Sequence, residues 1–502
     1  MKTYDVILIG TGAANIIADA AIEAHASVAI IERGRFGGTC LNRGCIPTKI
    51  LVTAANKICE YKEAGRIGVT IEGVRYDWQK VSQRLQAKLA ESPQIKTYYD
   101  AFPNVQTYEG TASFVDNKTL TVTFADGSTE TITGERIFIG TGGQTNIPHL
   151  PGLEEAGYVT SETFFSTAYP KQPYKKSLII LGGGPIGCEF AHVFEAAGTE
   201  VTLVQHNVRL LPKEDEDISA FLLTQFQNRH IHVHLNQDTL SVHIEGGKKI
   251  VTLQDRTTQA RREVQADEIL VAPGIRPMTK LLGLENTDVT VDPRGYIETN
   301  EFLETAADGI FAIGDVNGKA PFRHKANYEA EILADNLFTD TEPAQWRWAD
   351  YDTVPAVTYT YPEAAHVGMT EKEALAKGYA IKTVINHYSS SAKGYALGFE
   401  AGHDDDGFIK LVIDEQTQAI LGAHIIGPEA SILIQPFVNL LSWGMKVVKP
   451  INAHIASPTV KQLRSLPACR YLDPRLVTTL NQTMTPHPSL SEVTMWTRYY
   501  NH

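Results

Sequence analysis

The residues with the clearest chemical potential are Cys40 and Cys45, which stand five positions apart in the segment GGTCLNRGCIPTK of a chain that holds five cysteines. On a regular α-helix, side chains five positions apart point about 140° away from each other, so a single helix cannot hold them as a bridged pair. We therefore expect the two cysteines where a loop becomes a helix. Cys45 would then lie near a helix N-terminus, where the dipole and the free N–H groups favour a thiolate.

The residues around the two cysteines support this placement. Gly37, Gly38 and Gly44 free the backbone before the helix, and Pro47 is tolerated in a first helical turn. The run TKILVTAANKI that follows (48–58) has the apolar spacing of a helix. Five cysteines in a chain of this length do not form a structural disulfide framework. In a reducing compartment, a disulfide within this segment would therefore have to be redox-active.

The elements that must position this chemistry begin with a βαβ unit at the start of the chain. A strand (YDVILIG), a glycine turn, a helix (IIADAAIEAH) and a second strand ending at Glu32 follow one another. Gly10 and Gly12 would let the backbone approach a pyrophosphate at the helix N-terminus, and Glu32 would bind a ribose hydroxyl. Asn15 replaces the third glycine of the pattern. The strand, helix and terminal acid together still predict a dinucleotide site.

The same pattern occurs again at SLIILGGGPIGCEFAHVFEAAGTEVTLVQ, where Gly182, Gly184 and Gly187 follow a strand and precede a helix. Two dinucleotide sites in one chain suit one tightly held cofactor and one diffusible cofactor. At the end of the second strand stands Gln205, where an acid would indicate NADH and an arginine NADPH. Arg209 is close enough to meet a 2′-phosphate, but an ordinary surface arginine is an equally good interpretation. The nicotinamide could therefore be NADH or NADPH.

Further glycine-broken strands follow these two units. IFIGTGG contains Thr141 and Gly142, and VAPGIRPM contains Gly274. GIFAIGDVNG places Gly314 and Asp315 at the end of a strand, where a carboxylate can bind a hydroxylated cofactor chain. From about residue 350 the pattern changes to alternating strands and a helix, which predicts a separate α+β unit.

Composition limits the function classes. The net charge of −13 and the lack of a long Lys/Arg run argue against nucleic acid or an anionic membrane as partner. No apolar stretch approaches the roughly 18 residues of a membrane span, and the opening strand leaves no room for a signal peptide. We therefore expect a cytoplasmic location. The acidic clusters KEDED (213–217) and HDDDG (403–407) are expected to be solvated turns, and we expect no metal site.

These motifs, in this order, resemble those of the pyridine nucleotide-disulfide oxidoreductases, also called flavoprotein disulfide reductases, over nearly the whole chain. The resemblance implies an α/β protein with two Rossmann-like dinucleotide-binding domains and a C-terminal α+β dimerisation domain. FAD would occupy the first domain (1–150 and 275–347) and NADH or NADPH the second (151–274). The third (348–502) would form a homodimer in which each active site is completed by the partner's C-terminal domain.

The resemblance also assigns roles to individual residues. Cys45 would face the flavin and Cys40 would exchange with the substrate, while Lys49 and Glu189 would form a pair near the reactive flavin nitrogen. A cation beside the flavin stabilises its reduced anionic form, and a buried lysine needs a carboxylate partner. The residues expected to bind the two cofactors are Gly10, Gly12, Glu32, Thr39, Lys49, Thr141, Gly142, Gly182, Gly184, Gly187, Gln205, Arg209, Gly274, Gly314 and Asp315.

The family requires a His-Glu pair in a segment of the type H-P-T-x-x-E. HIASPTVKQ has Ser457 and Gln462 at the two positions, whereas TPHPSLSEV provides His487 and Glu492 in the right spacing. We therefore expect an insertion near 455–485, His487 as the acid/base and Glu492 as the carboxylate that orients it. Cys469, within the insertion, is expected to be a small apolar filler, with a third redox thiol as the alternative.

The resemblance implies an FAD-dependent NAD(P)H oxidoreductase acting on a small-molecule or lipoyl disulfide. Among the members of the family, the motifs are most similar to those of dihydrolipoamide dehydrogenase and mycothione reductase. The alternative is a flavoprotein quinone reductase, or diaphorase, or a redox sensor without disulfide turnover. Neither the disulfide nor the direction of the reaction follows from the sequence.

Overall fold

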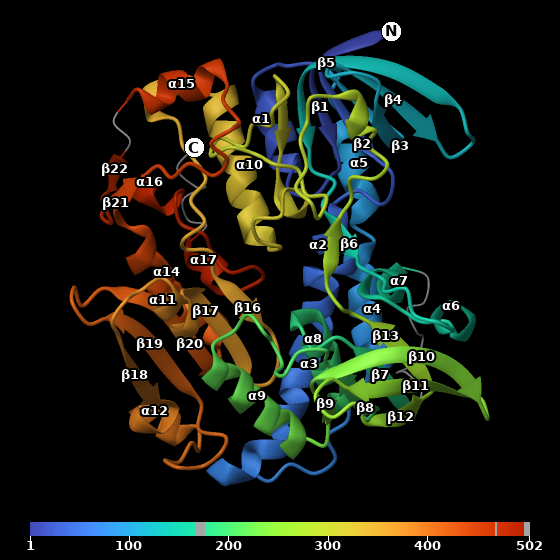
Figure 1. Cartoon of the computed structure of the whole chain (residues 1–502), viewed down its shortest axis with the longest axis vertical. Helices are drawn as coiled ribbons and strands as arrows, with labels where there is room; N and C mark the ends of the chain where they lie inside the picture. Colours follow the sequence, from blue (N-terminus) through green and yellow to red (C-terminus); the bar gives the residue numbers. More distant parts are fainter. Residues whose placement is uncertain (167–175, 467–468, 496–502) are drawn as a thin grey trace.

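A computed structural model describes residues 1–166, 176–466 and 469–495 of the chain (Figure 1). The first unit is built on a sheet in which β3, β2, β1, β5 and β15 run parallel. The other ends of β3 and β5 pair antiparallel with β4. The strands are β1 (Lys2–Ile9), β2 (Val28–Glu32), β3 (Val105–Phe114), β4 (Thr119–Phe124), β5 (Thr129–Ile139) and β15 (Ile310–Ala312).

Helices pack on this sheet because their apolar faces match its buried strands. Ile17 of α1, Ile332 of α10 and Phe138 of β5 belong to one buried cluster. The helices of this unit are α1 (Asn15–Glu23), α2 (Gly38–Arg43), α3 (Cys45–Glu63), α4 (Trp78–Leu89), α5 (Ser92–Asp100) and α10 (Arg323–Phe338). β15 and α10 come from beyond residue 300, so the first unit takes elements from both sides of the second.

The second unit is a parallel four-stranded sheet, in the order β13, β7, β8, β9, beside an antiparallel three-stranded sheet. Its main strands are β7 (Ser177–Leu181), β8 (Glu200–Val204), β9 (His232–His234) and β13 (Glu268–Val271). The antiparallel strands are β10 (Gln237–Glu245), β11 (Lys248–Asp255) and β12 (Arg261–Ala266). The helices are α6 (Leu153–Ala156), α7 (Ser161–Ser166), α8 (Pro185–Ala196) and α9 (Glu216–Asn228).

Two short strands, β6 (Gly143–Thr145) and β14 (Ile275–Pro277), pair antiparallel where the chain enters and leaves the second unit. The turns between elements include the 3₁₀ segments η1 (Ala64–Ile67), η2 (Leu284–Asn286), η3 (Gly314–Asn317), η4 (Pro343–Gln345) and η5 (Tyr388–Ser390). Among the residues that the structure describes, no helix is long and apolar enough to cross a membrane.

The C-terminal unit is an antiparallel sheet in the order β16, β17, β20, β19, β18, on the left of Figure 1. Its strands are β16 (Ala356–Thr358), β17 (Glu363–Gly368), β18 (Ile381–His387), β19 (Phe408–Asp414) and β20 (Ile420–Gly427). Helices α11 (Glu371–Ala376), α12 (Ala392–Ala396), α13 (Ala430–Leu433) and α14 (Gln435–Ser442) accompany them.

The last part of the chain forms short elements. β21 (Gly444–Val447) pairs with β22 (Cys469–Leu472), and α15 (Pro458–Arg464) lies between them in sequence. Helices α16 (Val477–Leu480) and α17 (Ser491–Met495) follow. Cys469 is exposed, so the expectation that it fills an apolar gap is wrong; β22 carries it on the surface.

The two acidic clusters are not simply solvated turns, contrary to the expectation from their composition. Glu214 and Asp215 are 4% and 3% exposed, because the C-terminal unit covers this turn of the second unit. Asp406 is equally buried and accepts hydrogen bonds from the backbone N–H and hydroxyl of Ser389. Both clusters therefore hold parts of the fold together.

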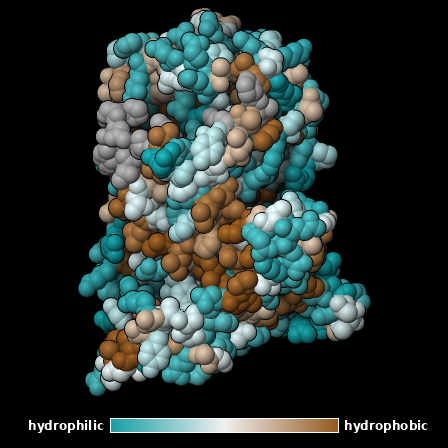
Figure 2. All heavy atoms as spheres, turned by 90° about the vertical axis from the view of Figure 1, so that its left-hand side faces the viewer, coloured by the Kyte–Doolittle hydropathy of each residue, from teal (hydrophilic) through white to brown (hydrophobic). Residues whose placement is uncertain are grey.

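One side of the C-terminal unit is apolar. Figure 2, which faces the left-hand side of Figure 1, shows hydrophobic side chains gathered in the middle of this side, with hydrophilic ones above and below. The exposed large hydrophobic residues of this unit include Leu433, Leu440, Met445, Val447, Tyr471, Leu476, Leu490 and Val493.

Candidate active site

Cys40 and Cys45 lie in two consecutive helices. Cys40 is buried in the middle of α2, and Cys45 is the first residue of α3. The expected position of Cys45 at a helix N-terminus is thus what the structure shows. Cys40, however, lies in a helix instead of a loop. The break between the helices falls at Gly44, whose backbone (φ −137°, ψ −113°) is not helical and turns the second cysteine toward the first.

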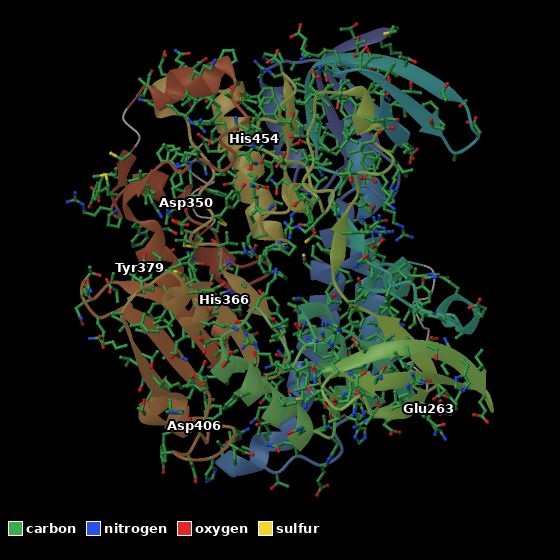
Figure 3. All side chains as sticks on the ribbon, in the orientation of Figure 1. Glu263, Asp350, His366, Tyr379, Asp406 and His454 are labelled. Carbon is green, nitrogen blue, oxygen red and sulfur yellow. The ribbon has the colours of Figure 1, made fainter. Side chains whose placement is uncertain are left out.

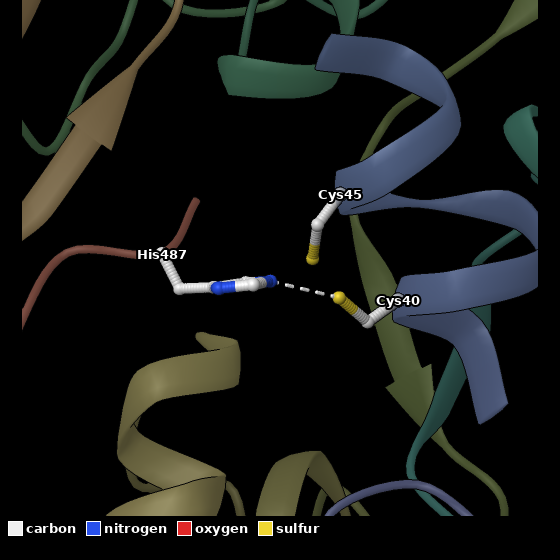
Figure 4. A group of neighbouring side chains, drawn as sticks. All are labelled: Cys40, Cys45 and His487. Carbon is white, nitrogen blue, oxygen red and sulfur yellow. Dashed lines mark hydrogen bonds between the residues drawn. The ribbon is translucent and has the colours of Figure 1, made fainter. Parts of the chain in front are cut away.

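His487 lies beside the two cysteines (Figure 4). Its Nε2 is 3.1 Å from the Sγ of Cys40, and its Nδ1 is 2.6 Å from the Oε1 of Glu492. The donor atoms of Cys40, Cys45 and His487 all lie within 4.8 Å of one another. When a carboxylate contacts an imidazole and the imidazole contacts a thiol, the imidazole can take the proton of the thiol and return it.

The histidine comes from the same chain as the cysteines in this structure, which differs from the expectation that the partner supplies it. The segment before α17 carries His487 back to α2 because the C-terminal unit packs on the first two units. Tyr359, just after β16, contacts Lys49 of α3 and Glu189 of α8. Sequence spacing cannot tell an intramolecular contact from the same contact between two chains.

The two cysteines experience opposite electrostatic effects. The interaction with Cys45 lowers the pKa of the Cys40 thiol against the effect of burial, and the charges of Arg323 and Lys49 lower it further. The pKa of Cys45 is raised well above its usual value by the interaction with Cys40 and by burial. The surroundings therefore favour a thiolate at Cys40 more than at Cys45. The helix N-terminus alone favoured a thiolate at Cys45, because it left out the second sulfur.

His487 is a strong base at this site. Burial disfavours its charged form, but the interactions with Cys45 and Glu492 outweigh burial and raise its pKa to about 9. Near neutral pH the ring is therefore protonated next to the Cys40 sulfur. Its Nε2 is 3.1 Å from that sulfur, and an imidazolium at this distance stabilises a thiolate.

Lys49 and Glu189 form the pair that the sequence suggested. The Nζ of Lys49 lies 2.9 Å and 2.7 Å from the two carboxylate oxygens. The backbone N–H of Tyr359 donates to Glu189 over 3.0 Å, and the Lys49 ammonium lies 4.3 Å from the centre of the Tyr359 ring. Sequence analysis missed Tyr359, because only the docking of β16 against α8 brings it here.

The first glycine turn has the shape of a pyrophosphate cradle. Gly10 has φ +101°, and a Cβ on it would lie 2.5 Å from the carbonyl oxygen of Gly140. A Cβ on Gly38 would lie 2.7 Å from the Cα of Gly12, so the turn fits tightly against the redox segment. Glu32 accepts hydrogen bonds from the N–H and hydroxyl of Thr11 over 3.0 and 2.7 Å. The turn therefore has the close backbone packing that a pyrophosphate site at a helix N-terminus requires.

Asp315 fits a hydroxylated cofactor chain. Burial raises the pKa of this carboxyl. A buried network that sequence analysis missed holds the turn that carries it: the fully buried Lys325 donates to the Gly314 carbonyl over 2.9 Å, and Glu329 accepts from the Gly314 N–H over 2.7 Å. Asn317 and Tyr351 complete the network around Glu329. The network therefore fixes the backbone of the turn, and the contact of Asp315 with a cofactor stays a prediction.

The other residues expected at the cofactors lie on connecting loops. The hydroxyl of Thr141 donates to the Met278 carbonyl, and Gly142 accepts from the Met278 N–H, each over 3.0 Å. Gly274 accepts from the N–H of Asn146. Thr39 is exposed on α2. The contact of Thr39, Thr141, Gly142 and Gly274 with a cofactor stays a prediction.

The second glycine turn is equally tight. A Cβ on Gly182 would lie 2.2 Å from the Ala272 carbonyl oxygen, and one on Gly187 would lie 1.8 Å from the Gly182 oxygen, whereas Gly184 has open space. Gln205 is buried and accepts from the Gly183 N–H over 3.2 Å. Its amide donates to the carbonyl of Arg209, whose guanidinium pairs with Glu216 over 2.5 Å. Gln205 thus holds the turn without placing a negative charge there.

The H-P-T-like segment that lacks its histidine has a structural task. The hydroxyl of Ser457 accepts from the Val460 N–H and caps α15. It also donates to Glu304 over 2.7 Å, and Arg464 binds Glu301 through two hydrogen bonds. This segment therefore docks α15 on the first unit instead of serving the thiols.

Two family models match the chain: the pyridine nucleotide-disulphide oxidoreductase model over residues 4–331 and the dimerisation domain of the same family over residues 354–466. The chain belongs to the pyridine nucleotide-disulfide oxidoreductase family. Members of this family are FAD-dependent oxidoreductases that use NAD(P)H and act on sulfur groups. The mixed α/β fold with a C-terminal dimerisation domain agrees with the expectation from the sequence.

Individual relatives point to the same class. Mycothione reductase of Mycobacterium tuberculosis is 35% identical over 452 residues, which cover 89% of this chain and 94% of that protein. Dihydrolipoyl dehydrogenase of Bacillus subtilis is 31% identical over 442 residues, covering 86% of this chain and 90% of that protein. The Cu(II) complex of the HOCl-induced flavoprotein disulfide reductase RclA from Escherichia coli has a TM-score of 0.74 at 27% identity, with 100% of both chains covered.

Proposed function

We propose that this chain reduces a small-molecule or lipoyl disulfide with electrons from NADH or NADPH, and that Cys40 is the residue that attacks the substrate. The observation that carries the proposal is the line of contacts from Glu492 through His487 to the lowered-pKa thiol of Cys40. When FAD is bound to the first unit, it supplies the redox chemistry by which two electrons pass from the nicotinamide to the Cys40–Cys45 disulfide.

The chain's own residues account for the exchange. The Cys40 thiolate attacks one sulfur of the substrate disulfide, and the imidazolium of His487 gives its proton to the departing thiolate. The imidazole of His487, now neutral, takes the proton of the Cys45 thiol, whose sulfur attacks Cys40; the second substrate thiolate leaves and takes that proton from His487. This leaves a disulfide between the two cysteines. Its reduction by two electrons, with uptake of two protons, returns the starting state. Lys49 of α3 is held by Glu189 and Tyr359 and supplies a fixed positive charge.

We infer that the cofactor residues act as the sequence indicates. Residues 1–150 and 275–347 would bind FAD through Gly10, Gly12, Glu32, Lys49 and Asp315, with residues 151–274 binding the nicotinamide dinucleotide. The tight turns at Gly10 and Gly182 and the unit formed from two chain segments support this division.

We infer further that two chains form a homodimer in the cytoplasm through the C-terminal unit (348–502). The matched dimerisation domain and the apolar side of this unit support the dimer (Figure 2). A continuous apolar surface on a protein usually marks an interaction site.

The test is anaerobic reduction of the purified flavoprotein by NADH or NADPH, followed by reoxidation with lipoamide, mycothione, glutathione disulfide and quinones in turn. Cys40→Ser should abolish disulfide turnover while leaving reduction of the flavin by nicotinamide intact. Cys469→Ser, at the exposed cysteine of β22, is the matched control and should change neither step. If quinones or oxygen alone reoxidise the wild-type protein, the quinone-reductase or sensor function replaces this one.

One observation favours a second candidate acceptor, a Cu(II) ion. Two sulfurs and an imidazole nitrogen within 4.8 Å of one another form a soft donor set that copper accepts, and RclA has been solved as a Cu(II) complex. The reduced dithiol holds two electrons, enough for two Cu(II) ions. Rapid reoxidation by Cu(II) with no reaction toward any disulfide would favour this candidate.

A further inference from the structure

A second group of titratable side chains lies between the second unit and the C-terminal unit. His366 of β17, His424 of β20 and Lys410 of β19 are direct neighbours across three adjacent strands. They face the acidic turn before α9, which contributes Glu214 and Asp215. In Figure 3 His366 lies on the inner side of the C-terminal unit, toward the other two units.

In the first half of this group, Lys410 and its carboxylate partners satisfy one another's charges and hydrogen bonds. The Nζ of Lys410 donates to Asp215 over 2.8 Å, to Asp217 over 2.6 Å and to Glu371 over 2.7 Å. The lysine side chain is 3% exposed, and its three donors have three carboxylate partners. Nothing further is needed to explain this half.

In the second half, formed by Glu214, His366 and His424, one buried nitrogen has no hydrogen-bond partner among the described residues. His424 is 0% exposed, and its Nε2 is 3.0 Å from the carbonyl oxygen of Met369, so Nε2 carries the proton. Its Nδ1 therefore carries a lone pair, and it has no hydrogen-bond partner among the described residues. His366 contacts Glu214 through Nδ1 over 2.7 Å. That hydrogen bond accounts for two of the three side chains and leaves the buried nitrogen of His424 unexplained.

The side chains of Glu214, His366 and His424 lie close enough together to bind one metal ion. One ligand atom from each of Glu214, His366 and His424 lies within 4.8 Å of the other two, and the two rings stack with centres 5.7 Å apart. Two imidazoles and one carboxylate make a known zinc ligand set. A metal-bound histidine usually donates its other N–H to a carbonyl or carboxylate, which fixes the ring. The Met369 carbonyl does this for His424.

We propose that Glu214, His366 and His424 bind one divalent transition-metal ion of the zinc class. The ion would give the unpaired nitrogen of His424 a partner. It would also tie the second unit, which supplies Glu214, to the C-terminal unit, which supplies both histidines. The site is separate from the redox pair, because none of its three ligands belongs to α2, α3 or α17.

The test must exclude metal binding by the thiols, because Cys40, Cys45 and His487 form another cluster of three donors. Zn²⁺ binding is therefore measured in the full-length Cys40→Ser/Cys45→Ser chain by competition with a chromophoric chelator. We expect one tightly bound Zn²⁺ per chain. His424→Leu and Glu214→Gln should each weaken it by about 100-fold or more, since even indirect partners of a metal are worth about 10–100-fold.

His454→Gln is the matched control, because His454 is an exposed histidine 3.3 Å from a carboxylate, that of Glu298. It should leave Zn²⁺ affinity unchanged. An equal loss in His454→Gln and His424→Leu, or no tight site in the double serine chain, would overturn the proposal. X-ray absorption at the zinc edge of oxidised wild-type protein, in which a Cys40–Cys45 disulfide removes both thiols as ligands, gives an answer that does not depend on variants folding. Nitrogen and oxygen neighbours support the site, and sulfur neighbours overturn it.

Discussion

Cys40 and Cys45 illustrate how two identical side chains acquire different chemistry. Cys40 is next to His487 and is influenced by Arg323 and Lys49, which lower its pKa, whereas burial and the neighbouring sulfur raise the pKa of Cys45. A thiolate at Cys40 is the nucleophile that disulfide exchange requires. Cys45 resolves the mixed disulfide in the next step, after its thiol has given its proton to the neutral imidazole of His487.

The pH dependence of this pair can be tested with Glu492→Gln. The pKa of His487 is raised to about 9 from an ordinary value near 6.5. The stabilisation from its protonated form is therefore complete below about pH 6.5 and is lost as the pH rises through about 9. Removing the Glu492 charge removes one cause of the rise. The alkaline limb of kcat/KM for disulfide reduction should then move to lower pH, as measured between pH 6 and 10.

Glu331→Gln is the control for this profile, because Glu331 lines the same pocket as His487 and Glu492, whereas Glu492 is the carboxylate 2.6 Å from the Nδ1 of His487. Its alkaline limb should coincide with that of wild type. A limb that stays in place in Glu492→Gln would show that the carboxylate does not set the basicity of His487.

We expect the choice of nicotinamide to depend on the charge at residue 205. Gln205 is neutral and buried beside the second glycine turn. A carboxylate at this position favours a ribose hydroxyl and repels a 2′-phosphate. Gln205→Glu should therefore raise KM for NADPH about tenfold, which corresponds to about 1.4 kcal/mol, and change KM for NADH little. Steady-state kinetics with both nucleotides check this, and equal effects on both would contradict it.

At the scale of elements, α10 and η3 are locked together by buried charges. Lys325 and Glu329 are fully buried and are hydrogen-bonded to both backbone groups of Gly314. Removing one member of a buried ion pair costs more than the pair contributes, because it leaves the other charge unpaired. The turn that carries Asp315 therefore depends on a residue ten positions later in the chain.

Lys325→Met should lower the free energy of unfolding by about 3–5 kcal/mol and reduce the flavin content of the purified protein. Lys449→Met is the control, because the ion pair of Lys449 with Asp352 is exposed and should be worth less than about 1 kcal/mol. Denaturant unfolding and flavin absorbance measure the two effects. Similar losses in both variants would show that burial of the Lys325 pair is not what matters.

At the scale of the whole molecule, the C-terminal unit both completes the redox site and presents an apolar side (Figure 2). In the structure His487 reaches the cysteines of its own chain. The same contacts would form if the two chains of a dimer exchanged their C-terminal units. The experiment that separates the two arrangements combines a Cys40→Ser chain with a His487→Gln chain.

Because the structure places both groups in one chain, mixed dimers of these two variants should recover no disulfide reduction. Each chain then lacks one member of its own site. Separately tagged chains, co-expressed and purified through both tags, provide the sample, and wild-type chains with the same tags are the control. Recovery of about half the wild-type rate would show that the partner supplies His487, since exchanged units leave one complete site in every mixed dimer.

Sequence alone determined the parts of this protein that depend on neighbouring residues. The redox segment and the two glycine turns could be found because each is a short pattern with a local physical cause. The His487–Glu492 spacing was found through the pattern that the family resemblance requires. The lysine-glutamate pair of Lys49 and Glu189 was found only through the family resemblance. The structure brings its two members together across α3 and α8.

Tertiary structure decided what distant segments do to one another. Tyr359 at Lys49, the buried Lys325 network and the burial of Glu214 follow from how the units dock. No pattern in KEDED indicates that a sheet about 150 residues later covers it. The charges of Arg323 and Lys49, which favour a thiolate at Cys40, likewise do not follow from the helix alone. Burial and charge are summed over the whole surroundings of a group, and those surroundings exist only in the folded chain.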